Sequence, residues 1–107
     1  MNPEESQEDT TPPSLSIISP VANATVSGLV TITAEATANS NRVISNVNFL
    51  VDGVLKLSDE VSPWEYELNT FEYDNGQISI KVIAYDNYGD SDSAMISLIL
   101  DNYIIWH

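Results

Sequence analysis

The chain lacks several residue types that chemistry commonly needs. It has 107 residues, no cysteine and a single histidine, which is the last residue, His107. Without cysteine there is no disulfide framework, no thiolate metal ligand and no cysteine nucleophile. One terminal histidine excludes a multi-histidine metal site and argues against a histidine-dependent catalytic triad.

Basic residues are also scarce. Three Lys and Arg stand against 16 Asp and Glu, which gives a formal net charge of −13. A surface this acidic repels phosphate, so nucleic acids and anionic lipids are poor partners. No apolar run approaches the roughly 20 residues that a membrane-spanning helix needs, so membrane insertion is not expected.

Motifs of common enzyme classes are missing as well. The sequence contains no Gly-x-Ser-x-Gly elbow around a nucleophilic serine and no glycine-rich phosphate loop. The acids are concentrated in turns and on polar faces, which is typical of a solvated surface. We therefore expect no catalytic residue, no cofactor-binding residue and no cofactor, and we expect the chain not to be an enzyme.

The two ends of the sequence differ from its middle. Residues 1–13 are polar and contain four acids and three prolines, so we expect a disordered acidic linker. Residues 103–107 form an apolar C-terminal extension. We expect this extension to continue the last strand within the chain, with pairing to another copy as the alternative, and we expect a monomer overall.

Between these ends, over residues 14–102, apolar and polar residues alternate with period two. The clearest case is the segment from Leu29 to Thr37, which is typical of a half-buried antiparallel strand. Asp52-Gly53 between two apolar runs predicts a tight hairpin. About seven short strands, with turns every 8–12 residues, are typical of an all-β sandwich.

The same alternation predicts the core. The residues expected to be buried are Ile32, Ala34, Val47, Phe49, Val51, Trp64, Tyr66, Ile80, Val82, Ala84, Ile96 and Leu98.

The segment from Gln77 to Tyr85 has an unusual outer face. Its odd-numbered positions are polar except for Ile83 and Tyr85, which indicates that this face is partly covered.

Several segments together resemble bacterial immunoglobulin-like domains. The matching residues are Ile18, Ser19, Pro20, Gly28, Val30, Ile32, Ala34, Ala36, Val47, Phe49, Val51, Asp52, Gly53, Pro63, Trp64, Tyr66, Gly76, Ile80, Val82, Ala84, Asp86 and Gly89. They occur in the order and spacing of the family over about residues 13–102. The resemblance implies an immunoglobulin-like β-sandwich of about seven antiparallel strands.

The resemblance also implies a role. Such domains occur as repeated or accessory modules of secreted and surface bacterial proteins, often beside glycan-degrading or adhesive domains. We therefore expect a non-catalytic spacer or adhesion module whose partners are neighbouring domains and a glycan or protein ligand. The full-length protein is expected to be secreted or attached to the cell surface, with a lipid anchor as one option. The alternative is a carbohydrate-binding accessory module of a glycan-active enzyme.

Two groups of residues are candidate ligand sites. Asp86, Asp90 and Asp92 place carboxylates at close spacing in one turn, which is compatible with calcium but also with an ordinary hairpin turn. Tyr73 and Tyr88 lie in predicted loops, where an exposed ring could contact a glycan. No metal is expected at the acidic turn, and both sites remain candidates only.

Overall fold

The computed structural model describes residues 12–39 and 41–103. Its elements, in chain order, are β1 (Ser14–Ser19), β2 (Thr25–Val26), β3 (Leu29–Thr37), β4 (Ile44–Val51), β5 (Val54–Asp59), β6 (Trp64–Asn69), the 3-10 helix η2 (Thr70–Glu72), β7 (Gly76–Asp86) and β8 (Ser91–Leu100). In this part of the chain no helix is long or apolar enough to cross a membrane.

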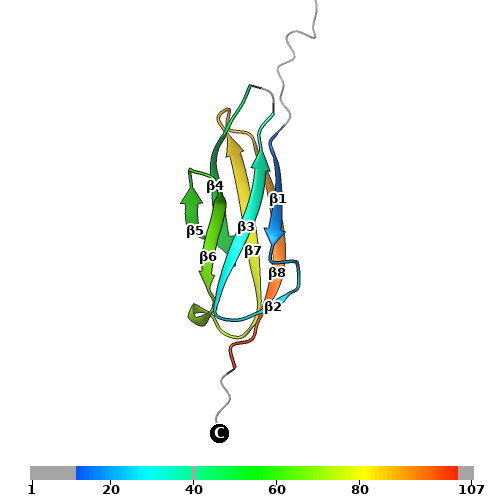
Figure 1. Cartoon of the computed structure of the whole chain (residues 1–107), viewed down its shortest axis with the longest axis vertical. Helices are drawn as coiled ribbons and strands as arrows, with labels where there is room; N and C mark the ends of the chain where they lie inside the picture. The colour runs from blue at the N-terminus through cyan, green and yellow to red at the C-terminus, as the bar shows by residue number, and fades with distance from the viewer. Residues whose placement is uncertain (1–11, 40, 104–107) are drawn as a thin grey trace, which may run out of the picture.

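The strands form two sheets that pack face to face (Figure 1). One sheet has the order β1-β3-β6 and the other has the order β2-β8-β7-β4-β5. The predicted all-β, immunoglobulin-like sandwich is therefore confirmed. It differs in one detail, because the described residues form eight strands and the short β2 pairs with β8 in parallel. Two residues are too few to show alternation in a sequence.

The hairpin between β4 and β5 forms as its sequence predicts. Val51 and Val54 are register partners, and Asp52 and Gly53 make the turn with φ angles of 48° and 84°. Positive φ at both turn positions follows the right-handed twist of the strands, and Asp-Gly tolerates it. A bulge on β5 places Lys56 opposite no residue of β4. Bulges and lysines are devices that protect an edge strand from pairing with other chains.

The core lies between the sheets and is built mainly from the predicted residues. Nine of the twelve predicted core residues are buried, and Leu68, Ile78 and Leu100 join them. Trp64, Tyr66 and Ile96 are only half-buried, so the prediction of full burial was wrong for these three. Trp64 and Tyr66 lie on β6, an edge strand, and Ile96 lies where β8 is paired only with β7.

The chain enters and leaves the sandwich at opposite ends. Pro12 precedes β1 at one end, and Tyr103 follows β8 at the other (Figure 1).

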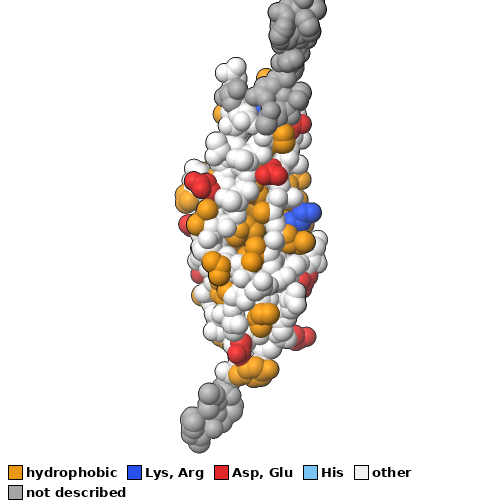
Figure 2. Space-filling view, turned by 90° about the vertical axis from the view of Figure 1, so that its right-hand side faces the viewer, with side chains coloured by type: hydrophobic (Ala, Val, Ile, Leu, Met, Phe, Trp, Pro, Cys, Tyr) orange, Lys and Arg blue, Asp and Glu red, His pale blue; other side chains and the backbone are white. Residues whose placement is uncertain are grey.

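Figure 2 shows the side of the molecule formed by β1 and β8. Hydrophobic side chains lie along the middle of this side, and acidic side chains lie around them. Most of the acidic leader and residues 104–107 of the extension fall outside the described residues, so the expectations for both segments stay predictions. Tyr103 is 76% exposed.

Candidate functional site

The acidic segment between β7 and β8 begins with a buried carboxylate. The expected turn is shorter than predicted, because Asp86 is the last residue of β7 and Asp92 already belongs to β8. Asp86 continues the inward phase of Val82 and Ala84, so its side chain points between the sheets, and the residue is only 2% exposed. Arg42, from the loop before β4, is 8% exposed. The expectation of a solvated acidic surface was therefore wrong for Asp86. Its position at the end of an alternating strand is the sequence signal for this burial.

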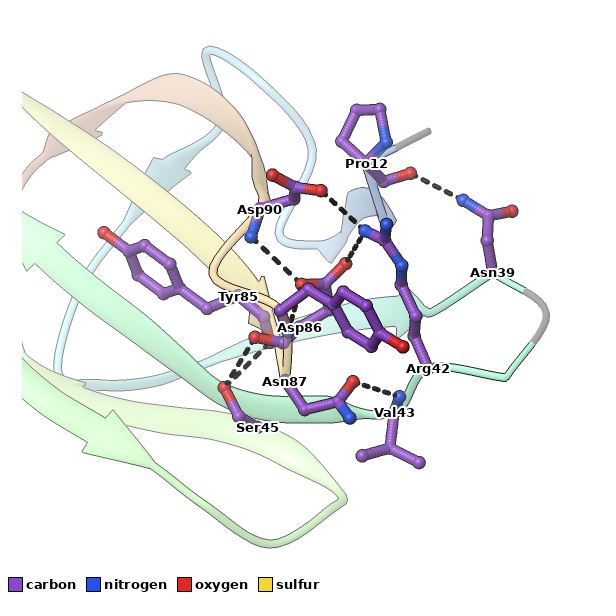
Figure 3. A network of polar contacts seen from close by, with 10 residues as sticks. Pro12, Asn39, Arg42, Val43, Ser45, Tyr85, Asp86, Asn87 and Asp90 are labelled. Carbon is purple, nitrogen blue, oxygen red and sulfur yellow. Dashed lines mark hydrogen bonds and ion pairs between the residues drawn. The ribbon is translucent and has the colours of Figure 1, made fainter. Parts of the chain in front are cut away.

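Arg42 forms a compact network with Asp86 and Asp90 (Figure 3). Arg42 Nη1 donates to Asp86 Oδ2 at 2.9 Å and to Asp90 Oδ2 at 2.6 Å. The other oxygen of Asp86, Oδ1, accepts from the backbone N–H groups of Tyr88 at 2.9 Å and Asp90 at 3.0 Å. The guanidinium carbon of Arg42 lies 4.2 Å from the centre of the Tyr88 ring. Both oxygens of Asp86 are thus occupied by protein donors.

These contacts fix the charge of the network. Burial alone would raise the pKa of Asp86, but the hydrogen bonds from Arg42, Tyr88 and Asp90 outweigh it and lower the pKa below the ordinary 3.8. The hydrogen bonds to Asp90 and Asp86 raise the pKa of Arg42 above its ordinary value. The pair therefore stays ionised throughout the neutral range.

A pH dependence follows from the lowered pKa of Asp86. At neutral pH Asp86 is deprotonated in both the folded and the unfolded protein. Its contribution to stability is lost as the pH falls through its pKa in the folded protein, which lies below 3.8. We expect the free energy of unfolding of the wild type to decrease below about pH 4. Part of this decrease comes from Asp86, and that part should be absent from Asp86→Asn. Urea unfolding of both proteins between about pH 6 and pH 2.5 measures the difference. Parallel pH profiles of the two proteins would contradict this account.

The same contacts bear on calcium. Asp86 and Asp90 bind Arg42, and Asp92 Oδ2 accepts from the backbone N–H of Leu15 at 3.0 Å. Within residues 12–39 and 41–103, no cluster of three or more potential ligands is arranged for a metal ion. Arg42 therefore brings Asp86 and Asp90 together, whereas Asp92 binds the start of β1, and protein donors use oxygens of all three acids.

We expect calcium and magnesium, at matched ionic strength, to raise the melting temperature equally. Either ion screens the repulsion within an acidic protein, whereas a specific calcium site would add stability with rising calcium concentration. Thermal unfolding in each salt tests this. A shift that only calcium produces, and that Asp90→Asn removes, would show a true calcium site.

The network also holds the entry of the chain. Asn39 Nδ2 donates to the backbone oxygen of Pro12 at 2.7 Å, and Asp92 accepts from Leu15. The backbone N–H of Val43 donates to Asn87 Oδ1 at 2.9 Å, and the backbone N–H of Asn87 donates back to the oxygen of Val43 at 3.0 Å. Two loops and the start of β1 are thus joined at one end of the sandwich.

A second polar cluster holds the exit of the chain at the opposite end. Asn102 Oδ1 accepts from the backbone N–H of Gly28 at 3.0 Å and from Thr70 Oγ1 at 3.1 Å. Asn102 Nδ2 donates to the oxygen of Thr70 at 3.1 Å, and the Asn102 N–H donates to Asn75 Oδ1 at 2.7 Å. Sequence reasoning missed Asn102, because an asparagine after a strand is typical of any loop.

The two candidate glycan-contacting tyrosines do not form one site. Tyr73 precedes β7 and Tyr88 follows it, so the 11-residue strand separates them by about 30 Å. Tyr73 is half-buried against the core, and its hydroxyl is buried without a hydrogen-bond partner among the described residues. Tyr88 is 61% exposed, and one face of its ring is covered by Arg42.

Comparisons with known proteins find relatives with the same architecture. The model of a family described as "Bacterial Ig domain" matches residues 13–82. Fibronectin(III)-like modules of CbhA from Clostridium thermocellum are 30% identical, with a TM-score of 0.72, and the match covers 85% of this chain and 100% of the module. No curated protein matches the chain.

A second solved structure shows the fold within a larger protein. It is the endo-beta-1,4-mannanase from Thermotoga petrophila, which is 17% identical with a TM-score of 0.74. The match covers 90% of this chain and only 21% of the mannanase chain. At this identity the likeness concerns the fold alone.

Proposed function

This chain belongs to the bacterial Ig domain family, and we propose that it acts as a non-catalytic spacer within a longer secreted or surface-attached bacterial protein. Modules of this kind are typical of extracellular proteins, and similar modules sit in longer multidomain chains. A lipid anchor elsewhere in the full-length protein would suit such a role. The partners of a spacer are the domains before and after it, and adhesion would then depend on those domains.

One observation supports this proposal most strongly. The chain enters and leaves at opposite ends of the sandwich, and a polar cluster fixes the chain direction at each end (Figure 1). Asn39 binds Pro12 at the entry, and Asn102 binds Gly28 and Thr70 at the exit. A module held in this way transmits orientation from one neighbour to the next, whereas a module with loose ends would act only as a flexible tether.

The spacer role predicts a fixed separation between the two ends. The chain has no cysteine, so Ser14→Cys and Asp101→Cys can carry spin labels at its entry and exit. We expect a single narrow distance distribution by double electron–electron resonance. Asn102→Ala should broaden it, because the last residues lose the hydrogen bonds to Gly28 and Thr70.

Ser97→Ala serves as the matched control for that measurement. Ser97 lies on β8, the strand that precedes Asn102, and among the described residues its side chain accepts one exposed hydrogen bond, from Gln77. A broad distribution in the unsubstituted protein would contradict the spacer role. An unchanged distribution in Asn102→Ala would show that Asn102 does not hold the exit.

A further inference from the structure

The outer face of the five-stranded sheet is open. Residues that face outward on β4, β7 and β8 are register partners and so form rows across the sheet. Two neighbouring rows are Asn46–Tyr85–Ser91 and Asn48–Ile83–Ser93. Tyr85 and Ile83 are half-buried within these rows, and no other described strand lies over this face. The Tyr85 ring points away from the network of Arg42 and Asp86 (Figure 3). The apolar character of Ile83 and Tyr85 predicts that another part of the protein covers this face, but none of the described residues does so.

The charge of this face differs from that of the rest of the molecule. No side chain that faces outward on β4, β7 or β8 is acidic, and Lys81 is the one charged group there. The outer face of the other sheet carries Glu35, Glu65 and Glu67, and the whole chain has a formal net charge of −13. The rows around Tyr85 and Ile83 contain no carboxylate that a neutral partner must desolvate. The Asp52 carboxylate lies farther along this face, near the start of β7, where Ser79 Oγ donates to it at 3.4 Å.

The neutral polar groups on this face are already oriented. Asn46 Nδ2 donates to Asn48 Oδ1 at 2.9 Å and to Ser58 Oγ at 3.2 Å, and Ser45 Oγ donates to Asn46 Oδ1 at 3.0 Å. These bonds hold the two amides beside Tyr85 and Ile83. Side chains fixed before binding lose less entropy when a ligand arrives.

This face combines a tyrosine ring and an aliphatic side chain with oriented amides and hydroxyls. Sugars have the complementary groups, because each ring carries both C–H groups and hydroxyls. The apolar groups fit the C–H faces of pyranose rings, and the amides and hydroxyls bond sugar hydroxyls. We propose that the outer face of β4, β7 and β8 binds an uncharged polysaccharide, with Tyr85 and Ile83 beneath the sugar rings and Asn46 and Asn48 beside them. This activity is additional to the spacer role and does not depend on it.

Affinity electrophoresis in native gels tests the proposal on the full 107-residue chain. The gels contain galactomannan, xyloglucan or mixed-linkage β-glucan as neutral probes, and polygalacturonate as an acidic probe. We expect at least one neutral polysaccharide, and not polygalacturonate, to retard the protein. Tyr85→Ala should weaken binding by about tenfold or more, because it removes the aromatic contact surface. Ile83→Asp should abolish binding, because it places a carboxylate at the centre of the face.

Tyr103→Ala is the matched control, since Tyr103 is an exposed tyrosine beyond β8. Its retardation should equal that of the unsubstituted protein. Circular dichroism confirms that each variant is folded. Three results would overturn the proposal: no retardation by any neutral probe, equal loss in Tyr103→Ala, or a concentration-dependent dimer that Ile83→Asp dissociates. The last result would show that this face binds another copy of the chain.

Discussion

Val82→Asp is expected to yield no folded protein. Val82 is 0% exposed, and it lies at the centre of the core between its register partners Phe49 on β4 and Ala94 on β8. A carboxylate there has no described donor to bind, and burial of an unpaired charge costs several kcal/mol or forces the group to remain protonated. A domain of this size has a total stability of about 5–15 kcal/mol, so this loss removes most of it.

The neighbouring residue provides the control. Ile83 is on the same strand but faces outward, so Ile83→Asp should leave the protein folded and lower the melting temperature by only a few degrees. Circular dichroism and thermal unfolding of the two variants measure this difference. A folded, soluble Val82→Asp protein, or an unfolded Ile83→Asp protein, would show that the register of β7 is wrong.

Much of the fold could be predicted from the sequence because strand periodicity is a local property. The alternation from Leu29 to Thr37 and the Asp52-Gly53 turn each identify their structure from a few adjacent residues. The parallel pair of β2 and β8 could not be found in this way, since it depends on where the chain crosses between the sheets. The half-burial of Trp64 and Tyr66 depends on β6 being an edge strand, which their own alternation does not reveal.

The polar clusters were harder to predict than the strands. Arg42 and Asp86 are 44 positions apart, and nothing local to Arg42 indicates that it is buried. One clue was present, because Asp86 continues the inward phase of a strand whose other inward residues are apolar. An acid in that phase requires a cation nearby, and the chain has only three lysines and arginines to supply one. Asn102 offered no comparable clue.

The ion pair carries the second large expected effect. Arg42→Ala should lower the melting temperature by roughly 10 °C or more, because it leaves Asp86 buried without an ion-pair partner among the described residues. Asp90 loses the same partner but is partly exposed, so water can replace Arg42 there. The cost therefore comes mainly from Asp86. The destabilisation should also extend to the chain entry, because Asn39, from the loop that carries Arg42, binds Pro12.

A double-mutant cycle separates the lost charge pair from lost packing. Asp86→Asn removes the buried charge while keeping an oxygen that can accept from the backbone of Tyr88 and Asp90. If the unpaired carboxylate is the main cost, Arg42→Ala combined with Asp86→Asn should be more stable than Arg42→Ala alone, and the two single effects should not add. Arg42→Lys should fall between the wild type and Arg42→Ala, since an ammonium keeps the charge but lacks the planar fork. Additive losses across the cycle would mean that Arg42 stabilises this end through its stacking on Tyr88 and not through Asp86.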